Sequence, residues 1–548
     1  NKYDLPFLQL VDGKGCMTTK GTKWEGLFCK DADKLILEDL DARGLLFNAP
    51  KFEHSYPFCW RCDTPLIYYA RDTWFIKMTA VKDDLIKNNK TINWIPKTIG
   101  EGRFGSWLEN VQDWGISRNR YWGTPLNVWE CSCGKRHVIG SIAELKEMSE
   151  NCPDDIELHR PFVDEVTIKC PDCGGEMHRV PEVIDCWFDS GAMPFAQWHY
   201  PFENKEIFEE NFPADFISEA VDQTRGWFYS LLAESTILFN KAPYKNVIVL
   251  GLVQDENGQK MSKSKGNAVD PFEALQKHGA DAVRWYFYSN SAPWLPNRFH
   301  DKAVTEGQRK FMGTLWNTYA FFVLYANIDS FDATKYELDY NSLSVMDKWM
   351  LSRVNSSVRE IDNNLANYKI TETTKILDKL VDDMSNWYVR LSRQRFWTKE
   401  MTQDKINAYM TLYTSLVTIA KAAAPMIPFM TEDIYQNLVR SIDNDAPESI
   451  HLCDFPEALD KFIDTDLEES MAEVVDIVVL GRACRNTSGL KSRQPLNAIY
   501  VKASSELKEF YKDIIKTELN IKNVEFTNDV SSFASYSFKP QLKTLGRP

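Results

Sequence analysis

The sequence contains no run of eighteen apolar residues and no charged-then-apolar leader, so no segment is suited to crossing a bilayer. It also has no initiator methionine, because it begins at Asn1. Internal repeats and low-complexity tracts are missing as well. We therefore expect a soluble, cytoplasmic, monomeric protein without a membrane partner, and a chain that starts inside a longer protein.

Positive charge is in short supply. The 64 Lys and Arg residues are outnumbered by 78 Asp and Glu, which gives a net charge of −14. This balance excludes a general nucleic-acid binder with a basic surface, so any contact with nucleic acid must be a local patch. With 548 residues, of which 44% are hydrophobic, the chain is long enough for roughly three to five domains.

Half of the twelve cysteines occur in close pairs. These pairs are Cys59 and Cys62, Cys131 and Cys133, and Cys170 and Cys173. In a large chain without a secretion signal, such pairs indicate thiolate metal ligands before disulfides. The last two pairs supply four thiolates, the number that a closed structural zinc site needs, with His137 as an alternative ligand. The first pair supplies only half of such a site.

Short apolar segments alternate with helical patterns between about residues 210 and 290. An extended stretch at 213–220 is followed by an amphipathic one at 222–239 and an apolar one at 246–253. A single further helix is expected over 270–289, with Asp270 as its cap and Pro271 at its first position. Strands that alternate with helices favour a parallel α/β sheet.

The segment "GQKMSKSKGN", residues 258–267, places three lysines between two glycines. Lysines this crowded repel one another unless an anion lies nearby, and the glycines let the backbone approach it. The loop follows the apolar 246–253 segment, and ligands of open α/β sheets bind beyond the carboxyl ends of the strands. A triphosphate suits that position, although the spacing is not that of a P-loop. A solvated basic loop is the alternative.

From about residue 302 the apolar residues recur every three or four positions, as in 349–365, 376–391 and 409–420. Pro425 and Pro428 stop the third run, and Thr431 is expected to cap a fourth helix. This pattern predicts a helix bundle whose apolar stripes form its core. After about residue 490 the pattern returns to mixed α and β.

Five motifs, in order along the chain, resemble those of a known family. "KMSKS", residues 260–264, is similar to the signature loop of the class I aminoacyl-tRNA synthetases. "DWGISRNRYWGTPLNVW", "DCWFDSGAMPFAQWHYP", "SEAVDQTRGWFYSLL" and "GADAVRWYFYS" together resemble the isoleucyl-tRNA synthetases of that class. The resemblance covers nearly the whole chain and is strongest from about residue 50 to 300.

The resemblance implies a reaction in two steps. Isoleucine attacks the α-phosphorus of ATP, with Mg²⁺ expected, and the adenylate then esterifies the terminal ribose of tRNA(Ile). The complete enzyme would also edit misactivated valine. Lys260 and Lys263 would neutralise the phosphates in the transition state, while Ser262 and Ser264 would shape the loop.

The resemblance further implies adenylate contacts from the "SEAVDQTRGWF" segment. Glu219 corresponds to a contact with the adenylate, and Asp222 and Gln223 lie close by at the start of the next helix. The alternative for Asp222 is a plain helix N-cap. The same cleft is expected to include Asp185, Trp187 and Asp189.

The fold class is therefore expected to be α/β plus α. Residues 1–70 would be the C-terminal remnant of an editing (connective peptide) domain. Residues 71–301 would be the second half of a Rossmann-type catalytic domain, with a zinc-knuckle insertion at about 126–180. A helical anticodon-binding domain would follow at 302–490, and a mixed α/β region would start at 491–548. Arg390, Arg393 and Arg395 are either phosphate contacts for tRNA or plain solvated surface.

One motif of the family is missing. A class I site also needs a His-x-Gly-His motif, and none of the eight histidines belongs to such a motif. We therefore expect the chain to carry one wall of an active site and to be inactive alone. Two other hypotheses for the function stay open: a valyl- or leucyl-tRNA synthetase, and a non-catalytic tRNA-binding fragment.

Overall fold

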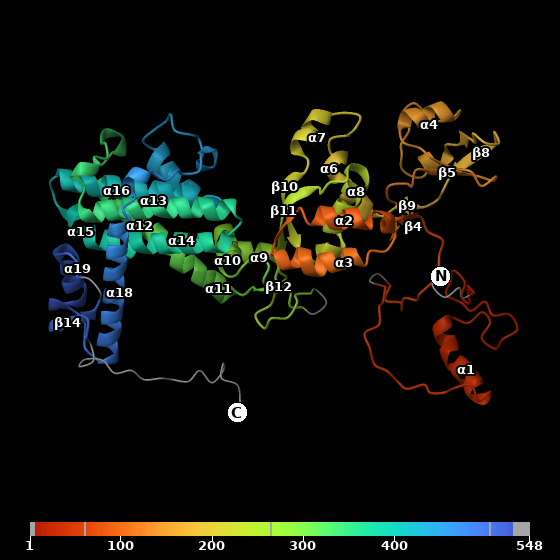
Figure 1. Ribbon diagram of the computed structural model, residues 1–548, viewed down its shortest axis with the longest axis horizontal. Coiled ribbons are helices and arrows are strands. Elements are labelled where there is room, and N and C mark those ends of the chain that lie inside the picture. Colours follow the sequence, from red (N-terminus) through yellow and green to blue (C-terminus); the bar gives the residue numbers. More distant parts are fainter. Residues whose placement is uncertain (1–5, 60–61, 263–265, 504–505, 530–548) are drawn as a thin grey trace. The chain divides into compact units, whose positions relative to one another are not determined.

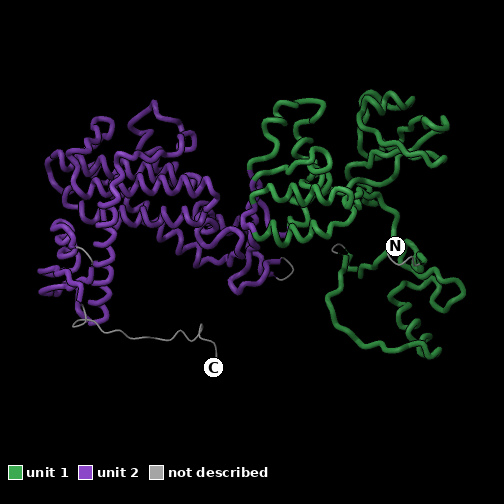
Figure 2. Tube along the Cα trace, in the orientation of Figure 1, with its two compact units in different colours: residues 1–93, 98–215, 223–245 green, residues 94–97, 216–222, 246–548 purple. Residues whose placement is uncertain are grey.

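The computed structural model describes residues 6–59, 62–262, 266–503 and 506–529. The chain divides into two compact units (Figure 2). Unit 1 comprises residues 1–93, 98–215 and 223–245, and unit 2 comprises residues 94–97, 216–222 and 246–548. None of the described helices combines the length and the apolar composition that a membrane crossing requires.

Unit 1 opens with an amphipathic helix and several short elements (Figure 1). These are α1 (Cys29–Ala42), β1 (Phe75–Ile76), η1 (Met78–Val81), α2 (Lys82–Asn89), η2 (Ile99–Phe104), α3 (Gly105–Glu109) and β3 (Trp114–Gly115). β1 and β3 pair in antiparallel fashion, which brings residues 75–76 and 114–115 together.

Residues 126–180 form a small module with its own core. Its four strands lie in the order β6-β5-β8-β7, and every neighbouring pair is antiparallel. The elements are β5 (Val128–Cys131), β6 (Arg136–Val138), α4 (Ile142–Met148), η3 (Phe162–Glu165), β7 (Ile168–Lys169) and β8 (Glu176–Arg179). Trp129 and Met177 are buried in a core that also includes Leu145 of α4 and Val163 of η3.

The rest of unit 1 is helical around one apolar helix. It comprises β4 (Ser117–Arg118), β9 (Val183–Ile184), α5 (Cys186–Gly191), α6 (Met193–Ala196), α7 (Lys205–Asn211) and α8 (Trp227–Phe239), which η4 (Val221–Arg225) precedes. Every residue of α8 from Phe228 to Thr236 is buried, because α2 and α5 pack against it. A helix with no polar face has to be covered on all sides.

An acidic side chain is buried in this packing. Glu234 on α8 is 3% exposed, and within the described residues neither of its carboxyl oxygens has a hydrogen-bond partner. Gly191 at the end of α5 makes room for it, since a Cβ there would lie 2.1 Å from Oε1 of Glu234. Burial, together with the nearby carboxylate of Asp189, raises the pKa of Glu234 to about 9. The group is therefore a neutral acid at pH 7.

The α/β part of the chain has two small sheets, and most residues of their strands belong to unit 2. The first has the strand order β10-β11-β2, with β10 (Ala214–Ala220), β11 (Tyr244–Leu250) and β2 (Asn93–Ile95). In the second, β12 (Val253–Gln254) pairs in parallel with β13 (Asn297–Arg298). The extended segments predicted at 213–220 and 246–253 are thus confirmed.

The single helix predicted over 270–289 is wrong, because the segment forms α9 (Pro271–His278) and α10 (Ala280–Ser289). Its start is as predicted: the Asp270 side chain accepts hydrogen bonds from two backbone N–H groups of the first turn. Gly279, with φ of +81°, ends the first helix, since a left-handed residue cannot continue it.

The remaining part of unit 2 is the predicted helix bundle. Its longer helices are α11 (Asp301–Gly307), α12 (Gly313–Asp329), α13 (Val345–Ala366), α14 (Ile370–Asp382), α15 (Arg390–Trp397), α16 (Gln403–Ala423), α17 (Pro428–Tyr435) and α18 (Thr465–Thr487). Short 3-10 and π-helical segments join or extend them: η6 (Gln308–Met312), η7 (Ala333–Lys335), η8 (Tyr340–Ser342), η9 (Asp383–Val389), η10 (Gln436–Arg440), η11 (Ile450–Leu452) and η12 (Asp460–Phe462). Thr431 lies inside α17 and bonds back to Ile427, so its predicted role as a cap is wrong.

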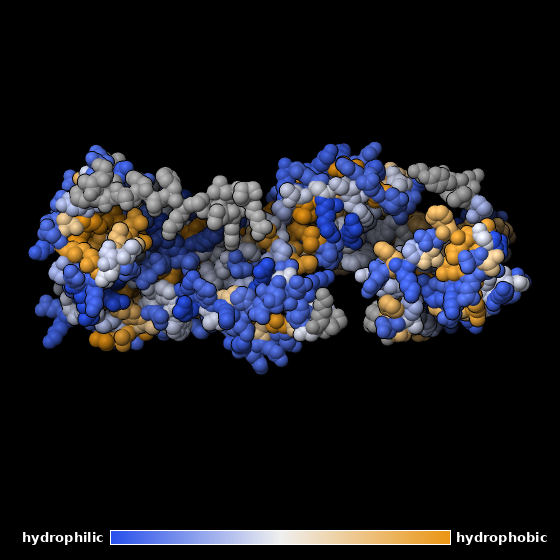
Figure 3. Space-filling model, turned by 90° about the horizontal axis from the view of Figure 1, so that it is seen from below, coloured by the Kyte–Doolittle hydropathy of each residue, from blue (hydrophilic) through white to orange (hydrophobic). Residues whose placement is uncertain are grey.

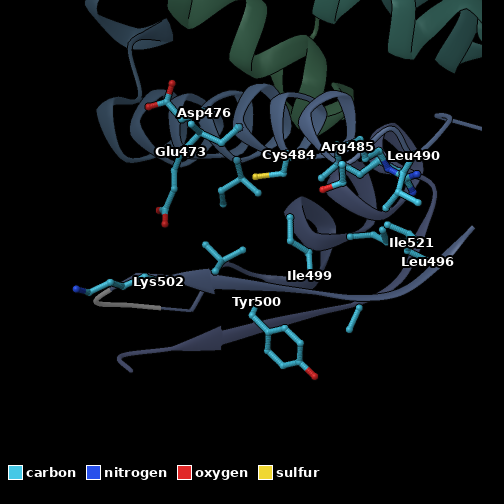
Figure 4. Close-up of a pocket in the computed structure, with 17 residues that line it drawn as sticks. Glu473, Asp476, Cys484, Arg485, Leu490, Leu496, Ile499, Tyr500, Lys502 and Ile521 are labelled. Atoms are coloured by element: carbon cyan, nitrogen blue, oxygen red, sulfur yellow. The ribbon is translucent and has the colours of Figure 1, made fainter. Parts of the chain in front are cut away.

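The described chain closes with a βαβ unit. β14 (Leu496–Lys502) and β15 (Ile521–Thr527) pair in parallel and are connected through α19 (Glu509–Leu519). A groove of about 610 Å³ runs between α18 and β14, and in Figure 4 Ile499 points toward it while Tyr500 points away. The face drawn in Figure 3 is mostly hydrophilic with separate apolar patches, as expected for a chain with a net charge of −14.

Replacement of Glu234 by Gln should stabilise the fold more at pH 8 than at pH 5. The native pKa of about 9 lies above the ordinary value of 4.5, so between these values the folded state keeps a proton that the unfolded state releases. The stability that this proton contributes is complete below pH 4.5 and is lost as the pH rises through 9. Gln does not titrate.

Urea unfolding at several pH values measures this effect. The difference in unfolding free energy between the Gln variant and the wild type should grow by up to about 1 kcal/mol per pH unit. The control is Glu206→Gln, at an exposed position on α7. Parallel pH curves for Glu234→Gln and the wild type would contradict a neutral buried acid.

Candidate functional site

Two tryptophans and a glutamine gather where α5 meets the start of α8. Oε1 of Gln223 accepts a hydrogen bond of 3.0 Å from the backbone N–H of Trp227. The indole Nε1 of Trp227 donates to the carbonyl of Ser190 at 3.1 Å, which ties the two helices together. Trp187 is 40% exposed and lies over Gly226, where a Cβ would be 3.0 Å from its ring. The cluster presents two indole rings and one amide group in unit 1.

Trp227 is the member of this cluster that sequence reasoning missed. Trp187 and Gln223 were predicted site residues, and the structure brings them together. The signal for Trp227 was Gly226, since a Cβ at that position would also lie 2.6 Å from Oε1 of Gln223. Gly226 precedes Trp227 and follows Gln223 by three positions. A glycine at such a place indicates that neighbouring side chains pack too closely to leave room for a Cβ.

Asp185 and Asp189, the two carboxylates of "DCWFDSG", differ in role. Asp185 caps α5 by accepting from the N–H of Trp187, and its Oδ2 binds Nη2 of Arg118 at 2.6 Å. It is 4% exposed, so it anchors α5 to β4 and does not face an open cleft. Partial burial, and then the charge of Asp185, raise the pKa of Asp189.

Glu219 and Asp222 belong to unit 2, and both residues are exposed. Glu219 lies on β10, which the hydroxyl of Ser218 fixes by donating to the carbonyl of Ile248 at 3.0 Å. Asp222 lies within the 3-10 turn η4, and Gly226 occupies the N-cap position of α8. The plain N-cap alternative for Asp222 is therefore wrong.

The lysine loop of unit 2 is held at its base by a polar clamp. Oδ1 of Asp255 accepts from the N–H groups of Asn257 at 3.0 Å and Gln259 at 2.8 Å. Oδ2 of Asp255 accepts from Nδ2 of Asn267 at 2.8 Å. Asn267 in turn accepts from the N–H of Ser262 at 2.9 Å, so the clamp joins both arms of the loop.

The clamp leaves the Lys260 side chain exposed. The backbone of Lys260 pairs with Gln254 in an antiparallel bridge. Gly258 has φ of +78°, and a Cβ there would lie 3.1 Å from the guanidinium of Arg298, so that cation rests against the loop. Lys263 and Ser264, the other predicted loop residues, lie outside the described residues. Sequence reasoning missed Asn267, which stands seven residues after Lys260.

The two later cysteine pairs come together in the 126–180 module. The Sγ atoms of Cys131, Cys133, Cys170 and Cys173 all lie within 4.8 Å of one another. Each pair spans a turn closed by a glycine of positive φ, Gly134 at +89° and Gly174 at +70°. A hydrogen bond from the N–H of Cys133 lowers the pKa of Cys131 to about 7, which favours a thiolate.

Four cysteine sulfurs at this spacing suit one tetrahedral metal ion. The ring of His137 instead bonds to Glu144, 2.9 Å from Nε2 to Oε1, so the alternative ligand is not part of the cluster. Cys59 and Cys62 do not join a group of three or more metal-binding side chains within the described residues. They stay the half site that the sequence predicts.

Two of the three arginines after Trp387 form ion pairs with carboxylates of the same unit. Arg395 makes a bidentate pair with the buried Asp347, both contacts being 2.8 Å. Arg390 pairs with Glu518 at 2.8 Å. A phosphate-contacting role for Arg395 is therefore wrong, because its fork is filled by a carboxylate. Arg393 is exposed, and its role stays a prediction.

Comparison with known proteins matches the chain to two families. The family described as "tRNA synthetases class I (I, L, M and V)" matches residues 17–295. The family described as "Anticodon-binding domain of tRNA ligase" matches residues 347–500.

Curated relatives are similar along the whole chain. Isoleucine–tRNA ligase of Clostridium novyi (strain NT) is 58% identical over 546 residues, 100% of this chain and 52% of the relative. The ligase of Clostridium acetobutylicum is 56% identical, with shares of 100% and 53%. Isoleucine–tRNA ligase 2 of Bacillus cereus (strain ATCC 14579) is 50% identical, with shares of 99% and 52%. The chain thus spans about half the length of these relatives.

A solved structure shares the fold. Methionyl-tRNA synthetase of Mycobacterium tuberculosis, bound by methionyl-adenylate, has a TM-score of 0.51 at 16% identity, over 73% of this chain and 72% of that one. The synthetase match at 17–295 covers just over half of the 548 residues. The chain therefore belongs to the class I tRNA synthetases of the isoleucine, leucine, methionine and valine group.

Proposed function

We propose that the protein containing this chain attaches isoleucine to tRNA(Ile), through an isoleucyl-adenylate formed from ATP. The observation that carries this is the 58% identity to an isoleucine–tRNA ligase along the complete chain. Valine- or leucine-specific relatives would share the loop and the bundle, so the amino acid is the point to test. Editing of misactivated valine belongs to the same proposal, because one methylene changes pocket affinity too little for accurate selection.

The amino acid is proposed to bind at the Trp187, Gln223 and Trp227 cluster. Two indole rings offer apolar contact to a branched side chain, and the amide of Gln223 is fixed by its bond to the N–H of Trp227. Glu219 and Asp222 supply carboxylates for ribose hydroxyls or an ammonium group. Their exposure on one short stretch of chain supports this role.

Phosphate charge is proposed to be neutralised by Lys260 and Lys263. When the amino-acid carboxylate attacks the α-phosphorus, the bond to pyrophosphate breaks and charge moves onto the leaving group. Ammonium groups on a loop clamped at its base can follow that charge, with Ser262 and Ser264 shaping the loop. Mg²⁺ bound with ATP would add further positive charge.

The domain assignment remains part of the proposal. Residues 1–70 are assigned to the end of an editing domain and 71–301 to the second half of the catalytic domain. The helices of 302–490 are assigned to anticodon binding, and the family match at 347–500 supports this. Zn²⁺ is assigned to the four cysteines of the 126–180 module, where it would fix the two turns and carry no reaction step.

Pyrophosphate exchange into ATP by the full-length protein tests the function. Exchange should depend on isoleucine in preference to valine and leucine. Lys263→Ala should slow it about 100-fold with little change in the KM for isoleucine, because the lysine acts on charge that develops in the transition state.

Lys205→Ala is the matched control, since this exposed lysine lies on α7. Preference for valine or leucine would overturn the isoleucine assignment. Full exchange in Lys263→Ala would remove that lysine from the mechanism. An absence of exchange with any amino acid would favour the non-catalytic tRNA-binding alternative.

Zinc content tests the metal assignment. Cys170→Ser in the full-length protein should lose one equivalent of zinc relative to the wild type, because three thiolates and a hydroxyl hold the ion far less tightly. Cys152→Ser, in the same module but outside the cluster, should keep the wild-type content. Equal zinc in both variants, measured by atomic absorption, would contradict the assignment.

A further inference from the structure

Glu234 is a titratable group that the proposed reaction does not use. Its side chain is almost fully buried, and neither carboxyl oxygen has a hydrogen-bond partner within the described residues. A buried polar group without a partner destabilises a fold. An unsatisfied group of this kind is therefore a candidate for a role other than folding.

The carboxyl lies on the face of α8 that packs against α5. Glu234 is seven residues after Trp227, which places the two side chains two turns apart on one face of the helix. Trp227 binds the carbonyl of Ser190, and Glu234 lies against the next residue, Gly191, where a Cβ would be 2.1 Å from Oε1. Two adjacent residues of α5 thus rest on one face of α8.

The same short helix carries Trp187 of the proposed amino-acid site. The hydroxyl of Ser190 donates to the carbonyl of Trp187 at 3.0 Å, so the indole is about one helical turn from the contact with α8. α5 has only six residues, and the side chains of Trp187 and Asp189 are exposed on it. A change at the Glu234 carboxyl therefore reaches Trp187 through Gly191 and Ser190.

No cation pairs with the Glu234 carboxyl within the described residues. The elements packed most closely on α8 are α5, α2 and η1, and η1 has no titratable residue. The titratable residues of α5 and α2 are Cys186, Asp189, Lys82, Asp83, Asp84 and Lys87. Burial, and then the charge of Asp189, raise the pKa of Glu234 to about 9. An ionised Glu234 would therefore face another carboxylate in a dry contact and draw water into it.

We propose that Glu234 is a positioning residue of the amino-acid site: its neutral carboxyl lets α5 pack on α8, and its ionisation opens that contact and weakens the binding of isoleucine. This inference rests on the proposed function, which places isoleucine at the Trp187, Gln223 and Trp227 cluster. Glu234 acts through the position of α5 and not on the substrate.

The proposal gives isoleucine binding a definite pH dependence. Isoleucine binds the closed helix pair and so favours the protonated form of Glu234. Because the pKa is raised to about 9, the site is complete at neutral pH and is lost as the pH rises through that value.

Isoleucine-dependent pyrophosphate exchange by the full-length protein at several pH values tests this. Glu234→Gln has the shape of the neutral acid and does not titrate. With a pKa of about 9, about a quarter of the wild type is protonated at pH 9.5. The ratio of the KM for isoleucine, wild type over Gln variant, should therefore rise from about 1 at pH 7 to about 4 at pH 9.5. This ratio cancels the titration of the ammonium group of isoleucine, and the same ratio for the KM of ATP should stay constant.

A second variant leaves Glu234 in place. Asp189→Asn removes a charge that favours the neutral acid, so the rise in the KM for isoleucine should begin at a lower pH than in the wild type. Glu206→Gln, at an exposed position on α7, should follow the wild type.

Identical pH curves of the KM for isoleucine in the wild type, Glu234→Gln and Asp189→Asn would overturn the role of Glu234. An equal rise in the KM values for isoleucine and ATP would also overturn it, because that result means a general loss of structure at alkaline pH. Absence of isoleucine-dependent exchange in the wild type at pH 7 would instead refute the proposed function.

Discussion

The packing of α5 on α8 is the constraint on which the catalytic part of this chain depends. The two helices approach so closely that Gly191 has no room for a side chain beside Glu234. The bond from Trp227 to the Ser190 carbonyl fixes their register. Motifs about forty residues apart in sequence thereby supply one cluster of rings and an amide. Glu234 fits this contact only as a neutral acid, because a buried carboxylate without a partner is costly.

The lysine loop, residues 258–267, concentrates positive charge, whereas the α5–α8 contact buries an acid in its neutral form. Crowded ammonium groups oppose an ordered loop, and Asp255 and Asn267 counter this by tying its two arms together below Lys260. The clamp orders the base and leaves the Lys260 side chain exposed. Such an arrangement suits a polyanion that arrives and departs, since phosphate supplies the missing counter-charge only while it is bound.

Features set by neighbours in the sequence were predicted well. Cysteine pairs within two or three residues can only form tight turns, so the Cys131 and Cys170 pairs led to a four-thiolate cluster. The cap at Asp270 is equally local. Features that need a distant partner were missed or wrong. Arg395 looks like a surface cation until Asp347, 48 residues away, fills its fork. Trp227 looks like core until its hydrogen bond to Ser190, 37 residues away, places it beside α5. One local feature was missed as well, because the left-handed φ of Gly279 does not show in an otherwise helical pattern.

The measurement that tests this helix pair most directly is calorimetric titration of the full-length protein with isoleucine, for the wild type and Gly191→Ala. A Cβ at Gly191 would lie 2.1 Å from Glu234 and 2.9 Å from the backbone of Ser230, so α5 must shift. Isoleucine affinity should fall about tenfold or more, because small displacements of binding groups are costly. Gly102→Ala, where a Cβ meets nothing within 4 Å, should bind normally. Wild-type affinity in Gly191→Ala would contradict an amino-acid site built on α5 and α8.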